Sequence, residues 1–524
     1  MERINNLKAK FITLSIPEDI DDGLETLKEY KDRWRSIRVI YFTMFLMSLG
    51  FSIVITGIWP FLNKLDPSAG KEFMGLVVGA NPLGQMIFSP LFGWWGNRLN
   101  SIRVPMYCSL TLFTIASATY SSLEFIPTYT KYWMLGSRFL VGVSSANVAV
   151  CRSYLSAATR ISERTKAISM ISLAQVMGFV IGPGLQAAVT PLKSEGILIF
   201  DFIKLDMYTA AGWINVLMSI CNVCLFLPVV FQERKIAAKE VMKIQGRKSE
   251  KETFKANKPD YVAAWNLIVA FFVLLFNFVL LETLGTSLTM DQFAWSKTEA
   301  LYYMGLLMSV GAILACITFV GIGPLCKIFA EENVLIWGGF SLMVIGRFVC
   351  IPWGDAPAKL AKTIDEIIAK NATIDFENDV QYLGCPETQE WCKYTPALTI
   401  TQFLLGYALT SIGYPIGITL IQTIFSKILG PRPQGVWMGL MTGSGCLSRV
   451  MGPVFVGYIY TRLGTYWTFG TTGVMMLVSM IWLHLFRKRL IPPKYEKNIE
   501  LQELNPKESL SQKENEHQYN KELA

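Results

Sequence analysis

Long apolar runs alternate with short polar segments along almost the whole chain. Most of the runs are about 20 residues long, the length that an α-helix needs to cross a bilayer. Residues 1–38 are polar and charged, so we expect no cleavable signal peptide and a permanent first helix. The pattern predicts an all-α polytopic membrane protein with twelve transmembrane helices, near residues 39–62, 73–96, 104–124, 132–153, 167–190, 207–231, 261–285, 300–320, 334–353, 397–425, 435–460 and 466–486.

The runs divide into two sets of six at the polar stretch 232–260, which has the composition of a linker. Gly182-Pro183 in the fifth run matches Gly452-Pro453 in the eleventh, at an offset of 453 − 183 = 270 residues. Two parallel six-helix repeats resemble the major facilitator fold, in which the transport site lies at the midplane between them. The expected organisation is an N-terminal segment 1–38, a six-helix bundle 39–231, a polybasic linker 232–260, a second bundle 261–486 with a loop at 354–395, and a tail 487–524.

Loop charge predicts the orientation of these helices. Loop 354–395 is rich in acidic residues, whereas the loops on the opposite side are basic, so by the positive-inside rule both termini and the linker are cytosolic. The sequon Asn371-Ala-Thr373 and the thiols of Cys385 and Cys392 in loop 354–395 agree, because glycans and disulfides belong to a lumen or the exterior. The basic positions are Arg33, Arg35, Arg38, Arg98, Arg103, Arg160, Arg164, Lys166, Arg432, the tract 234–258 and Arg487, Lys488 and Arg489.

Composition argues against an enzyme. The 524 residues are 52% hydrophobic and 17% charged, and they include two His and no HExxH, paired CxxC or GxSxG pattern. Most of the ten Cys lie inside apolar runs, where they are expected to be small core residues. The net charge of +8 lies in loops between apolar runs rather than in a basic domain, so we expect no nucleic acid, no cofactor and no metal, but a lipid bilayer as partner.

A loop motif follows the second run. Gly93-Trp94-Trp95-Gly96-Asn97-Arg98 resembles the major facilitator motif of Gly, a spaced Asp, and Arg. The resemblance implies that Gly93 lets helices approach closely while the polar residues brace the cytosolic gate. Asn97 stands where the superfamily usually has Asp, which leaves the charged part of that brace open.

The fourth run carries an arginine inside the predicted membrane span. Arg138, Gly142 and Ala146 share one helical face, and the small residues allow close packing. An intramembrane Arg is a functional-site hypothesis by default, with a structural Arg capped by backbone carbonyls as the alternative.

Glu282 lies in the seventh run, and resemblance to the fold places the fourth and seventh helices at the cavity. We hypothesise that Arg138 attracts an anion while Glu282 accepts a proton or balances Arg138. Burial without a partner would raise the pKa of Glu282, and a close Arg138 would oppose that shift. The alternative is that Glu282 is solvated near its helix end.

Glycine and proline mark the fifth and eleventh runs. Gly178, Gly182 and Pro183 are similar to a motif of proton-coupled antiporters and predict a bend or a close crossing between the halves. The eleventh run adds Arg449 before Gly452 and Pro453, whereas Arg347 in the ninth run is expected to extend its side chain to the membrane surface. Polar residues also occur inside the second, fourth and fifth runs, and they either line the pathway or join helices. They are Asn81, Gln85, Asn147 and Gln175.

Longer blocks carry a closer resemblance within the major facilitator superfamily. They are YKDRWRSIR at 30–38, NVAVCRSY at 147–154, LTMDQFAW at 288–295, SKILGPRPQGVWMG at 426–439 and GCPETQEWC at 384–392. They are similar to a lysosomal branch of the superfamily, which implies a lysosomal or late-endosomal membrane, a pairing of Cys385 with Cys392, and an anion among the candidate solutes. The acidic dileucine sorting signal that this branch would suggest is not evident in residues 1–38.

Three functions remain open at this point. The first is a secondary transporter that moves a small solute or anion, with protons as a candidate coupling ion, by alternating access. The second is a chloride or other anion channel on the same fold, in which Arg138 and Arg449 supply the field. The third is a membrane scaffold without transport, against which buried Arg and Glu argue. The oligomeric state is not predicted.

Overall fold

The computed structural model describes residues 23–493 except 127, 194, 200–202, 248, 355–356, 361–383 and 387–388. The first helix group comprises α2 (Leu27–Ile55), α3 (Ile58–Leu65), α4 (Gly70–Leu99), α5 (Arg103–Ser121), α6 (Thr130–Ser144), α7 (Asn147–Ala158), α8 (Ile161–Val189) and α9 (Thr209–Leu225). The second helix group comprises α12 (Tyr261–Phe293), α13 (Lys297–Ile328), α14 (Glu331–Asn333), the π-helical η5 (Val334–Phe340), α15 (Ser341–Val349), α17 (Ile400–Leu429) and α18 (Gly435–Leu485). Between the groups lie α10 (Ala237–Gln245) and α11 (Glu250–Ala256), and an antiparallel ribbon of β1 (Ile197–Ile199) and β2 (Ile203–Leu205) precedes α9.

The described residues contain twelve segments of membrane-crossing character. Eight segments are long and apolar enough by themselves, and α6 with α7 count as one of these, Thr130–Ala158. The helix α18 is two helices joined at Gly464, whose φ of +85° breaks the helical backbone. The less apolar α4, the 19-residue α5 and the short apolar α9 complete the set. The prediction of an all-α membrane protein with twelve crossing helices is therefore confirmed.

The first helix begins earlier than the sequence pattern predicts. We expected a start at residue 39, but α2 begins at Leu27, where Thr26 and Glu29 form a capping box. Arg33 lies inside this extension and is 0% exposed because Glu25 and Glu163 pair with its guanidinium at 2.7 and 2.9 Å. Because these carboxylates neutralise Arg33, α2 continues through residues that hydropathy alone assigns to the polar N-terminal segment.

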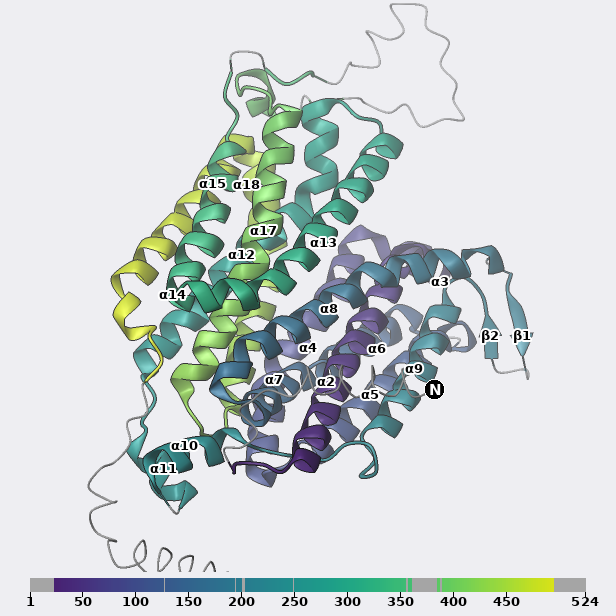
Figure 1. Cartoon of the computed structure of the whole chain (residues 1–524). Helices are drawn as coiled ribbons and strands as arrows, with labels where there is room; N and C mark the ends of the chain where they lie inside the picture. The colour runs from purple at the N-terminus through teal and green to yellow at the C-terminus, as the bar shows by residue number, and fades with distance from the viewer. Residues whose placement is uncertain are drawn as a thin grey trace, which may run out of the picture.

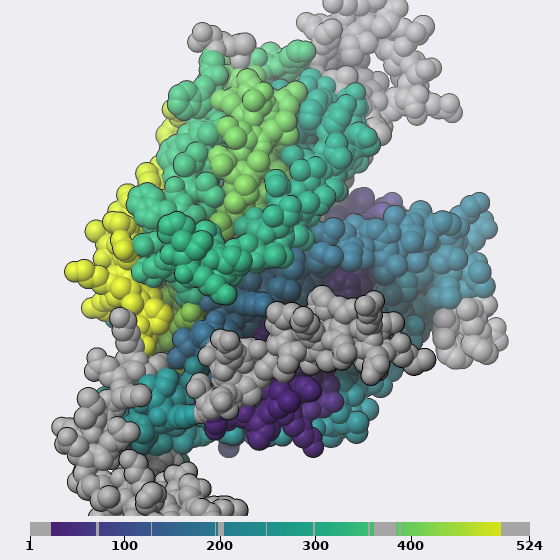
Figure 2. Space-filling view, viewed as in Figure 1, coloured from purple at the N-terminus to yellow at the C-terminus, as the bar shows by residue number. Residues whose placement is uncertain are grey.

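The two helix groups meet at one end and diverge at the other. Figure 1 shows the first group in purple and blue below the second group in green and yellow, with α10 and α11 at the end where the groups meet. We call this the linker end, and the opposite end, which carries the β ribbon and the loop between α15 and α17, the loop end. The space-filling view shows the two lobes in contact on the linker side and a notch between them toward the loop end (Figure 2).

Backbone contacts between glycines close the linker end. Gly93 of α4 and Gly435 of α18 lie so close that a Cβ on either residue would overlap the carbonyl group of the other. Asn97 Oδ1 accepts a hydrogen bond from the Gly435 N–H at 2.9 Å, at the start of α18. Asn97 therefore joins the two groups as a neutral acceptor at a helix N-terminus, where an aspartate is not needed. Arg98 lies over the Trp94 ring at 5.4 Å.

Residues related by the internal repeat meet each other at this end. Ser426 Oγ donates to Ser156 Oγ at 2.8 Å, and these residues are 270 positions apart, the same offset as the two Gly-Pro pairs. Arg164 donates to the Ser156 and Ser426 carbonyls at 2.9 and 3.2 Å. Gln434, which is 434 − 164 = 270 positions after Arg164, donates to the same Ser426 carbonyl at 2.7 Å. The repeat axis therefore passes between Ser156 and Ser426.

The glycines of the Gly-Pro motifs pack helices within a group. A Cβ on Gly178 would lie 2.5 Å from the Phe45 carbonyl oxygen, and one on Gly182 would lie 2.5 Å from Ser52 Oγ, both on α2. Gly452 faces Val279 of α12, at 3.1 Å from its Cγ1. The expected crossing between the halves at these motifs is therefore wrong, because Gly178 and Gly182 face α2 of their own group. The prolines, Pro183 and Pro453, lie inside α8 and α18.

An ion network holds the β ribbon at the loop end of the first group. Asp206 is 0% exposed and accepts hydrogen bonds from the Tyr208 and Thr209 N–H groups at 2.8 and 2.7 Å. Lys64 of α3 pairs with Asp206 at 3.1 Å and with Glu124 at 2.6 Å. Burial by itself would raise the pKa of Asp206, but these backbone and Lys64 hydrogen bonds outweigh burial and lower it.

Gly439→Leu should open the linker end. A Cβ at Gly439 would lie 2.5 Å from the Ser89 carbonyl oxygen and 2.6 Å from Pro90 Cα, so α18 must move off α4. Overpacking of this kind costs about 1–3 kcal/mol. We expect about tenfold less disulfide formation between Ser156→Cys and Ser426→Cys, measured by peptide mapping of the purified protein. Gly457→Leu on the same helix is the control, because a Cβ there meets nothing within 4 Å. Equal yields in both variants would contradict the proposed steric closure.

Asp206→Asn should destabilise the protein at neutral pH by about 2 kcal/mol, since it removes charge-assisted hydrogen bonds. The lowered pKa means that the stabilisation is present above the pKa of an unfolded Asp, about 3.9, and is lost as the pH falls through the folded value. Thermal unfolding in detergent should therefore show a wild-type advantage at neutral pH that shrinks below about pH 4. Glu195→Gln, at an exposed position just before β1, is the control. An advantage that is independent of pH would assign the effect to packing.

Candidate functional site

Two arginines, one from each helix group, lie within electrostatic range of each other. Arg152 of α7 is 8% exposed and donates through Nη2 to Gln175 Oε1 of α8 at 3.0 Å. Arg449 of α18 lies over the ring of Phe179 on α8, with 5.9 Å from Cζ to the ring centroid. The guanidinium groups of Arg152 and Arg449 lie close enough to repel each other. Neither makes an ion pair within 4 Å with any residue that the structure describes.

Glu282 supplies the negative charge nearest to this centre. It is exposed on α12 and within electrostatic range of Arg449, Tyr414 and Tyr407. Tyr414 on α17 stacks on Phe278 at 3.9 Å, is partly buried, and lies within electrostatic range of both arginines. The arginine within electrostatic range of Glu282 therefore belongs to its own helix group.

Arg138 occupies a separate position nearer the loop end. It is 3% exposed, its Cζ lies 5.4 Å from the Phe51 ring centroid, and Tyr120 is its electrostatic neighbour. Phe51 and Tyr120 belong to α2 and α5, so these contacts lie within the first group. The structure does not bring Arg138 and Glu282 together as the sequence hypothesis expected, because Arg138 faces its own group. Arg138 Nε has no hydrogen-bond partner among the described residues.

Gln85 connects the two groups at the level of the arginines. Its Nε2 donates to the Ser145 carbonyl at 3.0 Å, and its Oε1 accepts from Cys446 Sγ of α18 at 3.2 Å. Asn147, the first residue of α7, is 0% exposed, and neither atom of its amide has a partner in the described part of the chain. Gln85 therefore joins helices, whereas Asn147 retains unused hydrogen-bonding capacity.

The packing residue Gly142 behaves as its pattern predicts. A Cβ on Gly142 would overlap the Asn81 carbonyl of α4, so α6 and α4 are in backbone contact. This contact supports the helix that carries Arg138.

Arg347 is a buried arginine, not one that reaches the membrane surface. It is 0% exposed, and its Nη2 donates to the Asn277 carbonyl of α12 at 2.5 Å. The expectation of a surface-directed side chain is wrong because α15 packs on both α17 and α18. Gly346 faces the Gly406 carbonyl, and Gly473 leaves room for the Arg347 side chain. Arg347 therefore joins helices of the second group.

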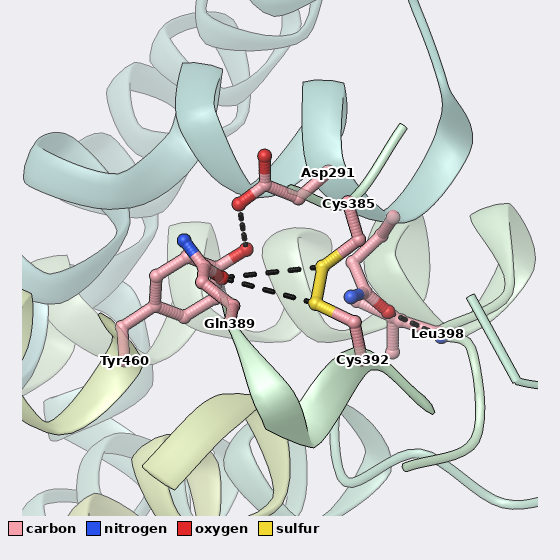
Figure 3. The surroundings of a disulfide bond; sticks show 7 residues. Asp291, Cys385, Gln389, Cys392, Leu398 and Tyr460 are labelled. Carbon is pink, nitrogen blue, oxygen red and sulfur yellow. Dashed lines mark hydrogen bonds between the residues drawn. A yellow bond between two sulfur atoms is a disulfide. The ribbon is translucent and has the colours of Figure 1, made fainter. Parts of the chain in front are cut away.

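A disulfide stabilises the loop end of the second group. Cys385 and Cys392 are bonded, and Gln389 Oε1 lies 3.9 and 4.0 Å from their sulfur atoms (Figure 3). Beside the disulfide, Tyr460 donates its hydroxyl hydrogen to Asp291 Oδ2 at 2.8 Å (Figure 3).

Trp391 within the disulfide loop covers the kink of α18, where a Cβ on Gly464 would lie 2.5 Å from its ring. The disulfide loop is therefore packed against the helix ends beneath it. The sequon at Asn371 lies outside the described residues.

Arg152 is the functional candidate that sequence reasoning did not select. The predicted span 132–153 placed it at the membrane surface, but the continuous segment Thr130–Ala158 extends beyond it. The rule that singled out Arg138, an arginine within an apolar run, applies equally to Arg152. Its position in the block NVAVCRSY was the available signal.

These features define a polytopic membrane protein with two helix groups around a polar centre. The chain belongs to the Major Facilitator Superfamily, whose family profile matches residues 40–358 and 393–515. It is 41% identical over 490 residues to "Major facilitator superfamily domain-containing protein 8" of Xenopus laevis. This alignment covers 90% of this chain and 95% of that protein.

Solved structures share the fold. The human organic anion transporter MFSD10 (TETRAN) superimposes with a TM-score of 0.58 at 17% identity, covering 86% of this chain and 99% of that one. A bacterial homologue of the iron transporter ferroportin, in an outward-facing state, gives a TM-score of 0.60 at 11% identity and the same coverage. At these identities the likeness extends to the fold alone.

Proposed function

We propose that this protein is a carrier that moves a small anion across a lysosomal membrane by alternating access. The observation that supports this most directly is the electrostatic proximity of Arg152 and Arg449, one from each helix group. Their guanidinium groups lie within electrostatic range of each other, and the carboxylate of Glu282 lies within range of Arg449. Membership of a superfamily of small-solute transporters gives the class of activity.

Electrostatics explains why an anion suits this position. Unpaired charges within a membrane are costly, and like charges near each other add to that cost. An anion between Arg152 and Arg449 offsets both terms and forms charge-assisted hydrogen bonds with a side chain from each group. Binding would then draw the two groups together, which is what closure around a substrate requires.

The other polar residues take supporting roles in this proposal. Glu282 balances Arg449 and is the proton acceptor when it is released from that arginine. Gln175 holds Arg152 in place through its 3.0 Å hydrogen bond. Arg138 lies on the loop-end side and attracts anions that enter, and Asn147 offers hydrogen bonds to the solute. Gln85 keeps the two groups in register through Cys446.

Alternating access follows from the asymmetry between the two ends. The bundles 39–231 and 261–486 would rock about the midplane site. The hydrogen bonds between the groups, in the part of the chain that the structure describes, lie at the linker end or midway. This arrangement is that of a carrier open toward the loop end, with Gly93, Asn97 and Arg98 near its closed gate.

The proposed orientation places the linker end in the cytosol and the loop end in the lumen. Loop charge, the disulfide between Cys385 and Cys392, and the relationship to major facilitator superfamily domain-containing protein 8 support it. Both termini are then cytosolic, and Asn371 is a luminal glycosylation site.

Arg449→Gln should impair anion transport. Loss of a charge-assisted hydrogen bond corresponds to about 1.5–3 kcal/mol, or roughly tenfold to hundredfold in kcat/KM. The assay is uptake of a panel of labelled inorganic and organic anions into vesicles that contain the purified protein, under an imposed pH gradient. We expect saturable uptake that unlabelled substrate on the opposite side accelerates. Arg152→Gln should act similarly, and Glu282→Gln should alter the dependence on loop-side pH.

Arg462→Gln is the matched control, since Arg462 is exposed on the same helix as Arg449. Its uptake should equal that of wild type. Wild-type kinetics for Arg449→Gln and Arg152→Gln together would remove the arginines from the site. A large, non-saturating current driven by a single-ion gradient would indicate a channel. The absence of both flux and current for every anion in the panel would contradict the carrier.

Asn371→Gln should remove a glycan from the protein expressed in animal cells. The expected result is a loss of the gel-mobility shift that endoglycosidase treatment produces in wild type. In intact lysosomes, protease added from the cytosolic side should cleave the linker around residues 237–256 and spare the loop 354–395. Cleavage of that loop from the cytosolic side would reverse the proposed orientation.

A further inference from the structure

A basic cavity lies at the linker end, far from the transport site. Its volume is about 510 Å³, and its walls come from α11, the start of α12 and the connection between α17 and α18. Three cationic side chains line it, Lys251, Lys255 and Arg432, together with the aromatic rings of Phe254, Tyr261 and Trp437. No acidic side chain is part of this lining.

Arginine and tryptophan give the cavity a fixed shape. Arg432 donates through Nη2 to the Phe254 carbonyl, which ties α11 to the connection between α17 and α18. Its buried Nε has no partner among the described residues and remains available as a donor. Trp437 stacks on Tyr261 at 5.5 Å and meets Trp265 edge-on at 5.9 Å. One wall of the cavity is therefore a rigid aromatic surface.

The cavity opens onto an apolar strip on the outside of α12. Tyr261, Val262, Trp265 and Val269 are between 48% and 57% exposed, although they are large apolar or aromatic side chains. On a protein that spans a membrane, such a strip is covered by lipid acyl chains. Aromatic rings of this kind lie at the level of the headgroups. The basic cavity therefore sits at headgroup depth, directly above an acyl-chain surface.

Neighbouring charges leave the region positive. Lys258 and the cluster Arg487, Lys488 and Arg489 add to the three cations of the lining. The acidic residues in the first turn of α11 and at the start of α12 are Glu250, Glu252 and Asp260. Asp260 is already used, because it accepts hydrogen bonds from the Val262 and Ala263 N–H groups and lies 3.7 Å from Arg489.

We propose that this cavity binds the phosphate headgroup of an anionic phospholipid from the surrounding leaflet. The phosphate lies among Lys251, Lys255 and Arg432, and the acyl chains follow the exposed strip of α12. A free phosphate compound would use the same cations but would leave the apolar strip without a role. The strip is the reason to assign the site to a lipid.

The test measures binding of short-chain phosphatidic acid with brominated acyl chains to the full-length protein in an uncharged detergent. Bromine quenches tryptophan emission on contact, so chains on the strip report through Trp265 and Trp437. We expect saturable quenching in wild type and at least tenfold weaker binding in Lys251→Gln/Lys255→Gln, since each cation near a lipid headgroup contributes roughly fivefold. Adding Arg432→Gln should weaken binding further, and Trp437→Phe should reduce the quenching amplitude because it removes one of the two reporting indoles.

Lys239→Gln/Lys243→Gln is the matched control. Both lysines are exposed on α10 in the same linker, and the variant removes the same charge away from the cavity. Its affinity should stay within twofold of wild type. An equal loss in both double variants would overturn the site in favour of diffuse charge attraction. Competition by glycerol 3-phosphate at the affinity of the lipid would overturn the lipid assignment, and equal binding of brominated phosphatidylcholine would overturn the role of the anionic headgroup.

Discussion

The contact of α4 with α18 at the linker end is the constraint on which the shape of the molecule depends. Gly93 and Gly435 bring two helix backbones together with no space for a side chain. Such an approach fixes the distance between the groups at one end and leaves the other end free to diverge. Ser156 and Ser426 lie on the repeat axis beside this contact, so the axis itself runs through the closed end. In the proposed alternating-access cycle, this axis would serve as the pivot of the two groups.

The repeat supplies a symmetric frame, but the chemistry within it is asymmetric. Phe179 and Arg449 are 449 − 179 = 270 positions apart and are therefore equivalent in the two repeats, yet one is a ring and the other a cation. Arg152 corresponds to Gln422, at 422 − 152 = 270, which is 1% exposed and has two side-chain atoms without partners in the described chain. Each group thus contributes one arginine at a position where the other group has a neutral residue. The two arginines therefore place two positive charges near the repeat axis, although the two groups differ in sequence at these positions.

Much of the fold could be predicted from the sequence because bilayer thickness sets helix length and the repeat sets the division. The predicted start of the first helix was wrong because hydropathy contains no information on the carboxylate partners of Arg33. The site was predicted only in part: hydropathy marks a charged residue such as Arg449 as unusual but carries no information on helix rotation. The proximity of Arg152 to Arg449, and the separation of Arg138 from Glu282, depend on that rotation and on side-chain reach.

The linker helices α10 and α11 connect the two helix groups at the closed end. Helix α10 is fixed to the first group, where Ile236 N–H donates to the Ala157 carbonyl at 2.9 Å and Val241 is 1% exposed. Helix α11 contacts the second group through Arg432, and reciprocal 3.0 Å hydrogen bonds between Gln245 and Asn257 join α10 to α11. Separation of the groups must therefore break one of these three connections. A phospholipid bound between α11 and the connection from α17 to α18 would add contacts that only the docked α11 can make, so it would oppose the loss of the Arg432 contact in the proposed cycle.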